Sequence, residues 1–148
     1  MKIIIGADDA GVRYRDRLAE DLRADDRVDE VVVLGPQDGR AEDYPGVAAQ
    51  AATMISDGEA DRAILVCGTG LGMAIAANKI KGIRAATAHD SFSVERSVLS
   101  NDAQVLAMGE RVIGLELARR LAKEWLGYTF DPTSRSAPKV EAIKKLED

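Results

Sequence analysis

The hydrophobic positions of the chain follow two alternating patterns. Short apolar runs rich in β-branched residues, typical of buried strands, are bounded by glycine or polar residues, as in Ile3–Ile5 before Gly6. Between these runs, apolar side chains recur at helical spacing, as in Tyr14, Leu18 and Leu22. The patterns predict strands over residues 3–5, 28–34, 62–66, 83–87 and 104–108. They predict helices over 12–23, 44–56 (with Asp43 as the N-cap), 91–99, 113–126 and 138–146, with a further helix ending near residue 79.

Strands that alternate with helices predict a five-stranded parallel, Rossmann-like sheet covered on both faces, which is a three-layer α/β/α sandwich. The 148 residues suit a single domain. The last segment, residues 127–148, carries Tyr128 and Phe130 after the final strand–helix unit, where these aromatic side chains have no obvious place in the chain's own core. We therefore expect a C-terminal helical arm that packs on the partner subunit of a homodimer, with an arm folded onto its own domain as the alternative.

The composition narrows the classes of function. The net charge is -5, the isoelectric point is about 5.0 and lysine and arginine form no stripe, so no nucleic-acid partner is expected. No apolar run approaches the roughly 18 residues of a membrane span, and the run after Met1 is too short for a signal peptide, which predicts a cytoplasmic protein without a membrane partner. A single cysteine and a single histidine exclude an internal disulfide and a ready Cys/His zinc cluster, and no metal or other cofactor is predicted.

Polar or reactive side chains follow four of the five predicted strands. Asp8 and Asp9 follow the first strand, Cys67 the third, His89 the fourth and Arg111 the fifth. The carboxyl ends of parallel strands lie along one edge of the sheet, where such folds bind ligands. Each of these residues alone is an ordinary polar residue at a strand end, and their coincidence favours a functional site at that edge.

The stretch from Cys67 to Gly72 is the most specific candidate for chemistry. An apolar strand runs into a glycine-rich turn and then into a helix, so several backbone N–H groups point at one place and suit a phosphate or an oxyanion. The helix N-terminus favours the thiolate form of a cysteine, which makes Cys67 a candidate general base. The alternative for a lone cysteine is a small buried hydrophobic residue.

Three kinds of function compete for this pattern. A dinucleotide site that combines the glycines of the turn with Asp90 has the wrong spacing, because Gly72 comes one residue early for that fingerprint. A phospho-acceptor signalling module would use the aspartates after the first strand, but it also needs an aspartate where Cys67 stands. The third is a sugar-phosphate enzyme, in which cations hold the phosphate and a base moves a proton between carbons.

Several short motifs of the chain occur together in one family. They are Gly6-Ala7-Asp8, Asp43-Tyr44-Pro45, Cys67-Gly68-Thr69-Gly70-Leu71-Gly72, Ala76-Ala77-Asn78-Lys79, Gly82-Ile83-Arg84-Ala85, Asn101-Asp102-Ala103 and Gly109-Glu110-Arg111-Val112-Ile113-Gly114. On these motifs the chain resembles, over essentially its whole length, the family of ribose-5-phosphate isomerase B and galactose-6-phosphate isomerase (RpiB/LacAB). The resemblance implies an aldose–ketose isomerase of a small sugar phosphate, working through a cis-enediolate without a metal, with a site shared between two subunits.

The resemblance also implies roles for individual residues. Cys67 is expected to move the proton between C1 and C2, and Thr69 with the amides of the turn is expected to cradle the enediolate oxygen. Arg111, Arg135 and Lys139 match the cationic positions around the phosphate. The substrate-binding positions implied in full are Asp8, Asp9, Tyr44, Gly68, Gly70, Gly72, Ser100, Asn101, Arg111, Arg135 and Lys139.

Three positions depart from the family's usual pattern. Asp9 and Ser100 stand where a histidine is usual, and Lys139 replaces what is commonly an arginine. The histidine expected at position 100 is thought to open the furanose ring. A tetrose 4-phosphate needs no such step, because its C4 hydroxyl is esterified and cannot close a five-membered ring. The stretches similar to the family's branch that acts on D-erythrulose 4-phosphate in erythritol catabolism are residues 88–90, 94–96, 99–101 and 130–132.

The resemblance leaves the substrate and the assembly open. The substrate is either a tetrose 4-phosphate or the ribose 5-phosphate of the pentose phosphate pathway, and a catalytically inert sugar-phosphate-binding protein is the alternative to an enzyme. A homodimer is expected, and pairing of dimers into tetramers is left open. His89 is predicted to supply an acid or a hydroxyl contact in place of the missing histidines, against the alternative of a surface histidine at a strand end.

Overall fold

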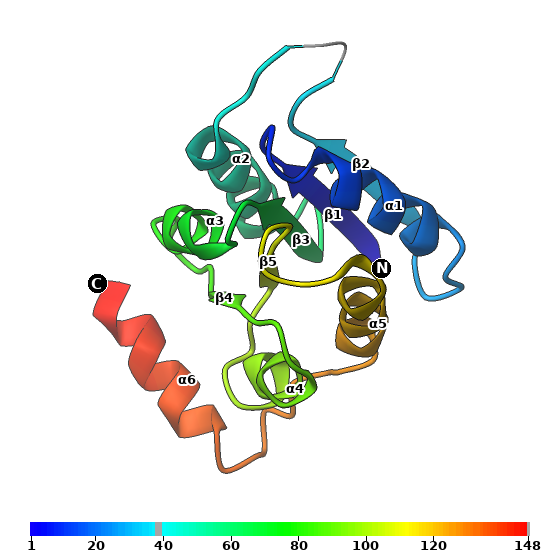
Figure 1. Ribbon diagram of the computed structural model, residues 1–148. Helices are drawn as coiled ribbons and strands as arrows, with labels where there is room; N and C mark the ends of the chain where they lie inside the picture. The colour runs from blue at the N-terminus through cyan, green and yellow to red at the C-terminus, as the bar shows by residue number, and fades with distance from the viewer. Residues whose placement is uncertain (38–39, 148) are drawn as a thin grey trace.

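The computed structural model describes residues 1–37 and 40–147. Five strands within these ranges form one parallel sheet in the order β2-β1-β3-β5-β4 (Figure 1). They are β1 (Lys2–Ala7), β2 (Glu30–Leu34), β3 (Arg62–Cys67), β4 (Ala85–Thr87) and β5 (Val105–Gly109). The predicted parallel sheet is confirmed, and its order places β3 in the centre between β1 and β5.

Helices cover both faces of the sheet (Figure 1). One face packs against α1 (Val12–Arg23), α4 (Ser91–Leu99) and α5 (Leu115–Leu126), and the other against α2 (Tyr44–Ser56) and α3 (Leu71–Ala77). The chain thus forms the predicted three-layer α/β/α sandwich. In the described ranges, none of the helices is both long and apolar enough to cross a lipid bilayer.

The strands are apolar at nearly every position because both faces of the sheet are covered. In β1, Ile3 and Ile5 belong to the core shared with α1, α4 and α5, whereas Ile4 belongs to the core shared with α2 and α3. In β3, every side chain from Ala63 to Val66 is fully buried. The sheet is therefore a rigid support whose strand ends hold fixed positions.

Several predicted ends of strands and helices shift by two residues, in some cases because a tight turn takes the place of the strand. β4 begins at residue 85 instead of 83, because the N–H of Ile83 donates to the carbonyl of Ile80 in a tight turn (3.2 Å). β2 begins at residue 30 instead of 28, because the N–H of Val28 donates to Asp25 (2.9 Å). Similarly, α5 begins at residue 115 instead of 113, and α3 ends at residue 77 instead of 79.

The C-terminal segment begins on its own domain. Tyr128 packs against the core on the side of α1 and α5, and its carbonyl accepts a hydrogen bond of 2.6 Å from the guanidinium of Arg62. That guanidinium also lies over the ring of Trp125, 5.1 Å from its centroid. The expectation that Tyr128 has no place in its own core is therefore wrong, because Arg62 binds the chain at this point.

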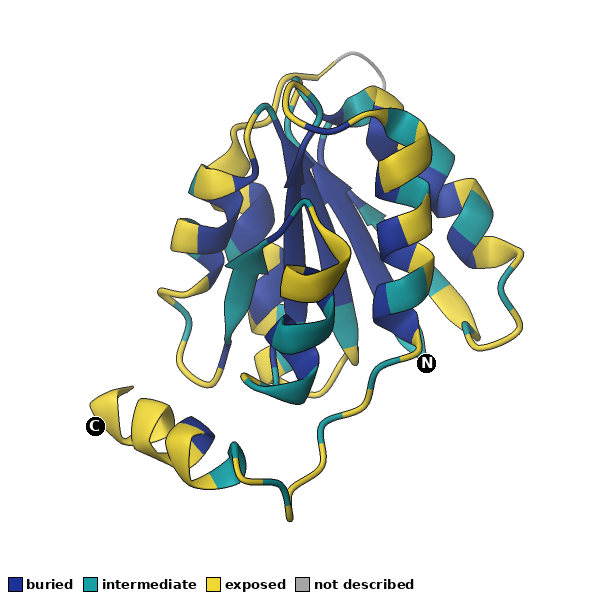
Figure 2. Cartoon of the chain, turned by 60° about the horizontal axis from the view of Figure 1, so that its bottom comes forward, coloured by how far each residue is buried: buried dark blue, intermediate teal, exposed yellow. Residues whose placement is uncertain are grey.

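After this contact the chain leaves the body of the domain. The helix α6 (Ala137–Lys144) and the short 3₁₀ turn Lys145–Glu147 lie beside the amino-terminal end of the sheet, apart from both helical layers (Figures 1 and 2). Val140 is the buried residue of α6, and the carboxylate of Glu147 accepts a hydrogen bond of 3.0 Å from the N–H of Gly82. Most of the arm is thus free to contact another subunit, which stays a prediction. Residue 148 lies outside the described residues.

The core assignment can be tested on α5. Leu121→Ala is expected to lower the free energy of unfolding by about 2–5 kcal/mol, because it leaves a cavity at a fully buried position. Leu117, one turn earlier on the same helix, is 45% exposed, so Leu117→Ala is expected to change it by no more than about 0.5 kcal/mol. Urea unfolding of both variants measures the difference, and equal losses would contradict the assigned buried face.

Candidate active site

The carboxyl ends of three neighbouring strands bring predicted reactive residues to one edge of the sheet. β1 and β3 are neighbours, and the N–H of Asp8 donates to the carbonyl of Val66 at 3.3 Å. β3 and β5 are also neighbours, and Cys67 pairs in register with Gly109. Asp8, Cys67 and Arg111 are therefore placed along one rim, as predicted.

The turn after β3 is built around the thiol of Cys67. This side chain is buried, and the N–H of Gly70 donates to its Sγ at 3.0 Å. This contact fixes the position of the sulfur within the turn, at the carboxyl end of β3. Gly70 has a φ of +80°, and a Cβ there would lie 2.9 Å from the backbone of Met108, so the turn requires glycine at this position.

The end of β5 holds this turn from the other side. The N–H of Glu110 donates to the carbonyl of Cys67 at 2.9 Å. The next N–H, of Arg111, donates to the carbonyl of Gly68 at 3.0 Å. The side chain of Arg111 lies against Gly68, since a Cβ on that glycine would meet its Cδ at 3.5 Å. Arg111 is exposed, so its guanidinium can bind an anion at the rim.

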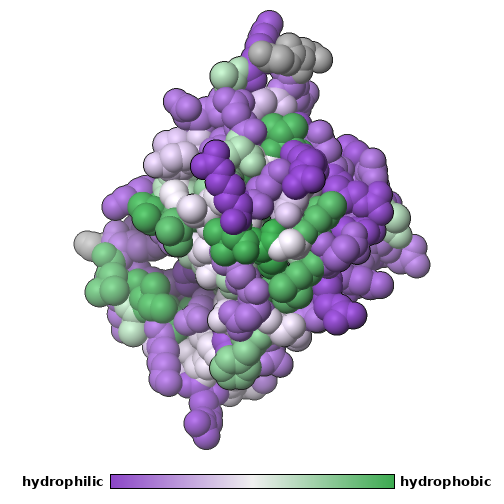
Figure 3. All heavy atoms as spheres, viewed as in Figure 1, coloured by the Kyte–Doolittle hydropathy of each residue, from purple (hydrophilic) through white to green (hydrophobic). Residues whose placement is uncertain are grey.

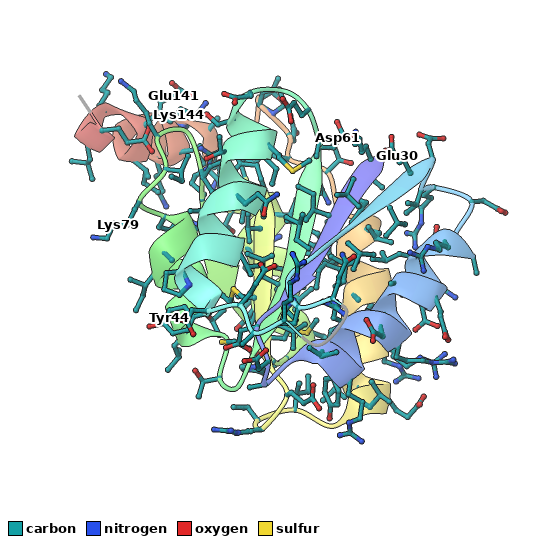
Figure 4. All side chains as sticks on the ribbon, turned by 90° about the horizontal axis from the view of Figure 1, so that it is seen from above. Glu30, Tyr44, Asp61, Lys79, Glu141 and Lys144 are labelled. Carbon is teal, nitrogen blue, oxygen red and sulfur yellow. The ribbon has the colours of Figure 1, made fainter. Side chains whose placement is uncertain are left out.

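Tyr44, the first residue of α2, covers the N-terminus of α3. A Cβ on Gly72 would lie 2.5 Å from the ring of Tyr44, so the ring rests directly on this backbone. The Oγ1 of Thr69 accepts a hydrogen bond of 3.3 Å from the N–H of Leu71 and belongs to the same turn. Figure 4 shows Tyr44 at the opposite end of the sheet from Asp61, the residue before β3. The structure thus places Tyr44 and Thr69 with the thiol, at the carboxyl rim.

The two aspartates after β1 have different environments. Asp8 is half-buried, and its Oδ1 accepts a hydrogen bond of 3.0 Å from the N–H of Ala10, whereas Asp9 is exposed. Burial raises the pKa of Asp8 above its usual range, and the negative charge of Asp9 adds to the rise. Asp8 is thus a fixed hydrogen-bond acceptor suited to a sugar hydroxyl. Among the residues that the structure describes, no three His, Cys, Asp or Glu side chains form a group that could hold a metal ion.

His89 follows β4 and faces the end of β5. Its Nε2 accepts a hydrogen bond of 2.9 Å from the N–H of Gly109, so Nε2 carries no proton. Burial lowers the pKa of His89, and the carboxylate of Asp90 opposes this shift only in part. The neutral imidazole can then donate only through Nδ1. A direct contact of His89 with the substrate stays a prediction, and Nδ1 is the atom that could make it.

Four of the residues implied in substrate binding lie at the opposite edge of the sheet: Ser100, Asn101, Arg135 and Lys139. The carbonyl of Asn101 accepts a hydrogen bond of 3.0 Å from Nε of Arg84, which directly precedes β4. The last two lie in or just before α6, and Figure 4 shows α6 at the end of the sheet that carries Asp61. The five residues of β5 span roughly 16 Å. One chain therefore does not bring these side chains to Cys67.

Two residues that support the site were not predicted. The Oγ1 of Thr87 donates to the carbonyl of Gly70 at 2.9 Å. The side chain of Asn78 bonds to both the N–H and the carbonyl of Ala85, at 2.7 and 2.9 Å. Both contacts tie α3 to β4. The sequence holds a signal for Thr87, which lies two residues before His89 and so on the same face of the extended chain.

The chain is similar to known sugar isomerases along nearly its whole length. The family model described as Ribose/Galactose Isomerase matches residues 3–143. The chain is 63% identical to D-erythrulose-4-phosphate isomerase 2 of Mycolicibacterium smegmatis, over 99% of this chain and 97% of that relative. It is 40% identical to ribose-5-phosphate isomerase B of Escherichia coli, over 99% of this chain and 96% of that relative. The structure of ribose-5-phosphate isomerase B from Clostridium thermocellum is similar with a TM-score of 0.92 and 41% identity, covering 99% of this chain and 97% of that one.

The tight turn at Gly70 predicts an unequal effect of two alanine substitutions. Gly58→Ala is expected to cost about 1–2 kcal/mol of unfolding free energy, because Gly58 has a φ of +76° but open space for a Cβ. Gly70→Ala is expected to cost roughly 1–3 kcal/mol more, since its Cβ also meets the backbone of Met108. Urea unfolding measures both, and the same loss in the two variants would contradict the close approach.

Proposed function

The chain belongs to the ribose/galactose isomerase family, and we propose that it interconverts an aldose phosphate and a ketose phosphate by moving a proton between C1 and C2. The observation that carries this proposal is the hydrogen bond of 3.0 Å from the N–H of Gly70 to the thiol of Cys67. In this proposal the cysteine held by the contact is the base, and the turn around it supplies N–H donors for a developing negative oxygen.

Cys67 is the group that moves the proton. Its thiolate takes the proton from C2 of the aldose, the electron pair of that C–H bond forms the C1–C2 double bond, and the oxygen on C1 gains negative charge. The proton of the C2 hydroxyl passes to the oxygen on C1, and the thiol returns its proton to C1, which gives the ketose. We assign stabilisation of the cis-enediolate oxygen to Thr69 and the amides of the turn, and a sugar-hydroxyl contact to Asp8.

A second copy of the chain completes the site. Arg111 supplies a cation at the carboxyl rim, while Arg135 and Lys139 lie at the other edge of their own sheet. Asn101 also lies at that far edge, just before β5. In a homodimer, the far edge and arm of one copy meet the rim of the other, so that cations from both chains surround the phosphate.

Exposed apolar side chains support this homodimer. Leu71 and Ile75 of α3 are 57% and 63% exposed, and Ile143 and Leu146 of the C-terminal segment are 38% and 85% exposed. Figure 3 shows hydrophobic surface over both α3 and the C-terminal segment on one face of the molecule. Apolar surface that is gathered in this way marks a protein interface. We therefore assign α3 and the arm to the contact between the two copies.

We propose a four-carbon substrate, D-erythrulose 4-phosphate with its aldose D-erythrose 4-phosphate, ahead of ribose 5-phosphate. The relative at 63% identity is named for the four-carbon sugar, and the relative at 40% for the pentose. Neither Asp9 nor Ser100 offers an imidazole to open a furanose ring, and the Nε2 of His89 is already engaged. The enzyme would then serve erythritol catabolism in the cytoplasm.

The substrate preference has a direct assay. Purified protein is mixed with D-erythrulose 4-phosphate or with ribose 5-phosphate, and conversion is followed by NMR. We expect kcat/KM for the four-carbon sugar to be higher by at least about tenfold, because no ring has to be opened before the proton is removed. Faster turnover of ribose 5-phosphate would contradict the substrate, and turnover of neither would favour an inert sugar-phosphate-binding protein.

The role of Cys67 predicts loss of proton exchange. In D₂O, the wild-type enzyme is expected to incorporate deuterium at the carbon next to the carbonyl. Cys67→Ala is expected to lower the rate of deuterium incorporation by about 10²–10⁴-fold, because the base is removed. Thr53→Ala, at an exposed position of α2, is the control and keeps the rate. Deuterium uptake by Cys67→Ala at the original rate would mean that another group is the base.

The homodimer predicts that a charge on α3 separates the subunits. Ile75→Asp is expected to shift the protein to monomers in analytical ultracentrifugation and to remove activity, because a carboxylate would be buried in the contact. Leu117→Asp, at a partly exposed position of α5, is the matched control and keeps the dimer. The proposal fails if the unchanged protein is an active monomer or if Ile75→Asp remains an active dimer.

A further inference from the structure

The imidazole of His89 is anchored where two segments of the site meet. Its Nε2 accepts the N–H of Gly109 at 2.9 Å. Gly109 is packed directly on the turn after β3, since a Cβ there would lie 2.6 Å from Cα of Thr69 and 2.8 Å from the carbonyl of Gly68. Cys67 pairs with Gly109 in the register of β3 and β5. His89 therefore holds the peptide N–H of Gly109, the last residue of β5, which is paired in register with Cys67.

The two residues after Gly109 connect its peptide to the turn that holds the thiol. The next two N–H groups, of Glu110 and Arg111, are the ones that bind the carbonyls of the turn at 2.9 and 3.0 Å. The guanidinium of Arg111 follows on the same short stretch and lies against Gly68. A change in the orientation of the Gly109 peptide would therefore move both the turn that holds the thiol and the cation at the rim.

We propose that His89 is a positioning residue, which holds the peptide of Gly109 through Nε2 and thereby sets the geometry of Cys67 and Arg111, instead of transferring a proton to the substrate. The inference rests on the proposed isomerase function, since turnover is one of its readouts. Thr87, two residues before His89, also holds the turn, because its Oγ1 donates a hydrogen bond of 2.9 Å to the carbonyl of Gly70. The edge strand β4 thus supports the site at two points.

This role requires one protonation state of the imidazole. Nε2 must be free to accept, so the proton sits on Nδ1, and an imidazolium would place two N–H donors against each other. Asp90 is the charged neighbour of His89 in the chain. On the packed elements, Cys67 ends β3 on the far side of β5, Arg111 follows β5, and Glu124 of α5 accepts a hydrogen bond from Ser91, two residues after His89. Asp90 favours the imidazolium, and burial disfavours it more strongly.

The sign of the pH effect follows from the lowered pKa of His89. The unfolded imidazole takes a proton near its ordinary pKa of 6.5, while the folded one stays neutral to lower pH. The free energy of unfolding therefore falls as the pH drops below about 6.5 and through the folded pKa of His89. A glutamine at this position would remove that dependence while keeping an acceptor oxygen near the place of Nε2.

The tautomer can be measured directly because the chain holds a single histidine. In a ¹⁵N NMR spectrum of the unchanged protein at pH 7.5, we expect one imidazole with a protonated Nδ1 and a bare Nε2. A protonated Nε2, or a rapidly exchanging mixture of the two tautomers, would overturn the inference whatever the activity of the protein. The NMR result does not depend on the proposed reaction, so a failure of the positioning role of His89 can be distinguished from a failure of the proposed isomerase function.

Kinetics of substituted proteins separate positioning from proton transfer. His89→Leu removes the acceptor and is expected to lower kcat/KM by roughly 10²-fold, since misplacement by about 1 Å costs this much. His89→Gln restores an acceptor and is expected to return kcat/KM to within about tenfold of the original, because an amide can accept the N–H of Gly109 but cannot pass on a proton. Equal loss in both variants would indicate an acid and contradict the inference.

A control and a pH profile complete this experiment. Ser91→Ala removes the hydrogen bond to Glu124 at an exposed position two residues away and is expected to leave kcat and KM unchanged. Any loss of kcat on the acid side that comes from protonation of His89 should be absent in His89→Gln. An acid-side profile that is identical in His89→Gln and the unchanged enzyme would overturn the coupling of His89 to the site.

Discussion

The arrangement of the site depends on the close contact between two backbone segments, the turn after β3 and the end of β5. Glycines make this contact possible: Gly70 meets the backbone of Met108, and Gly109 meets that of Thr69, at distances that a Cβ would not allow. The N–H groups at the end of β5 then bind the carbonyls of the turn. Within the turn, the N–H of Gly70 donates to the thiol of Cys67, so the thiol is held by backbone groups and not by flexible side chains.

The same parallel sheet that gathers these groups also separates them from the other residues proposed to bind the substrate. Residues that follow strands lie at one edge, and residues that precede strands, such as Asn101 before β5, lie at the other. The arm with Arg135 and Lys139 begins on that second edge, where Arg62 binds the carbonyl of Tyr128. If the proposed roles of Arg135, Lys139 and Asn101 hold, catalysis depends on assembly, because one chain does not bring its two sheet edges together.

Much of this could be predicted from the sequence, for reasons that lie in local pattern. Buried parallel strands are continuous apolar runs, so the sheet and the rim with Asp8 and Cys67 follow from periodicity and connection order. Hydrogen-bond partners do not, since they depend on which strands are neighbours. Because β4 lies beside β5 in the sheet, His89 contacts Gly109, and the sequence alone does not show that the two strands are neighbours. Likewise, Arg62 stacks on Trp125 and binds the carbonyl of Tyr128, a contact that the local sequence around Tyr128 does not predict.

The most direct test of a site built from two chains is complementation. Cys67→Ala and Arg135→Ala are each prepared as inactive homodimers, unfolded together in equal amounts and refolded. In a mixed dimer, one of the two sites joins an intact Cys67 to an intact Arg135, so random pairing is expected to restore roughly a quarter of the original activity per dimer. A refolded mixture as inactive as the separate variants, although mixed dimers have formed, would contradict a site shared between subunits.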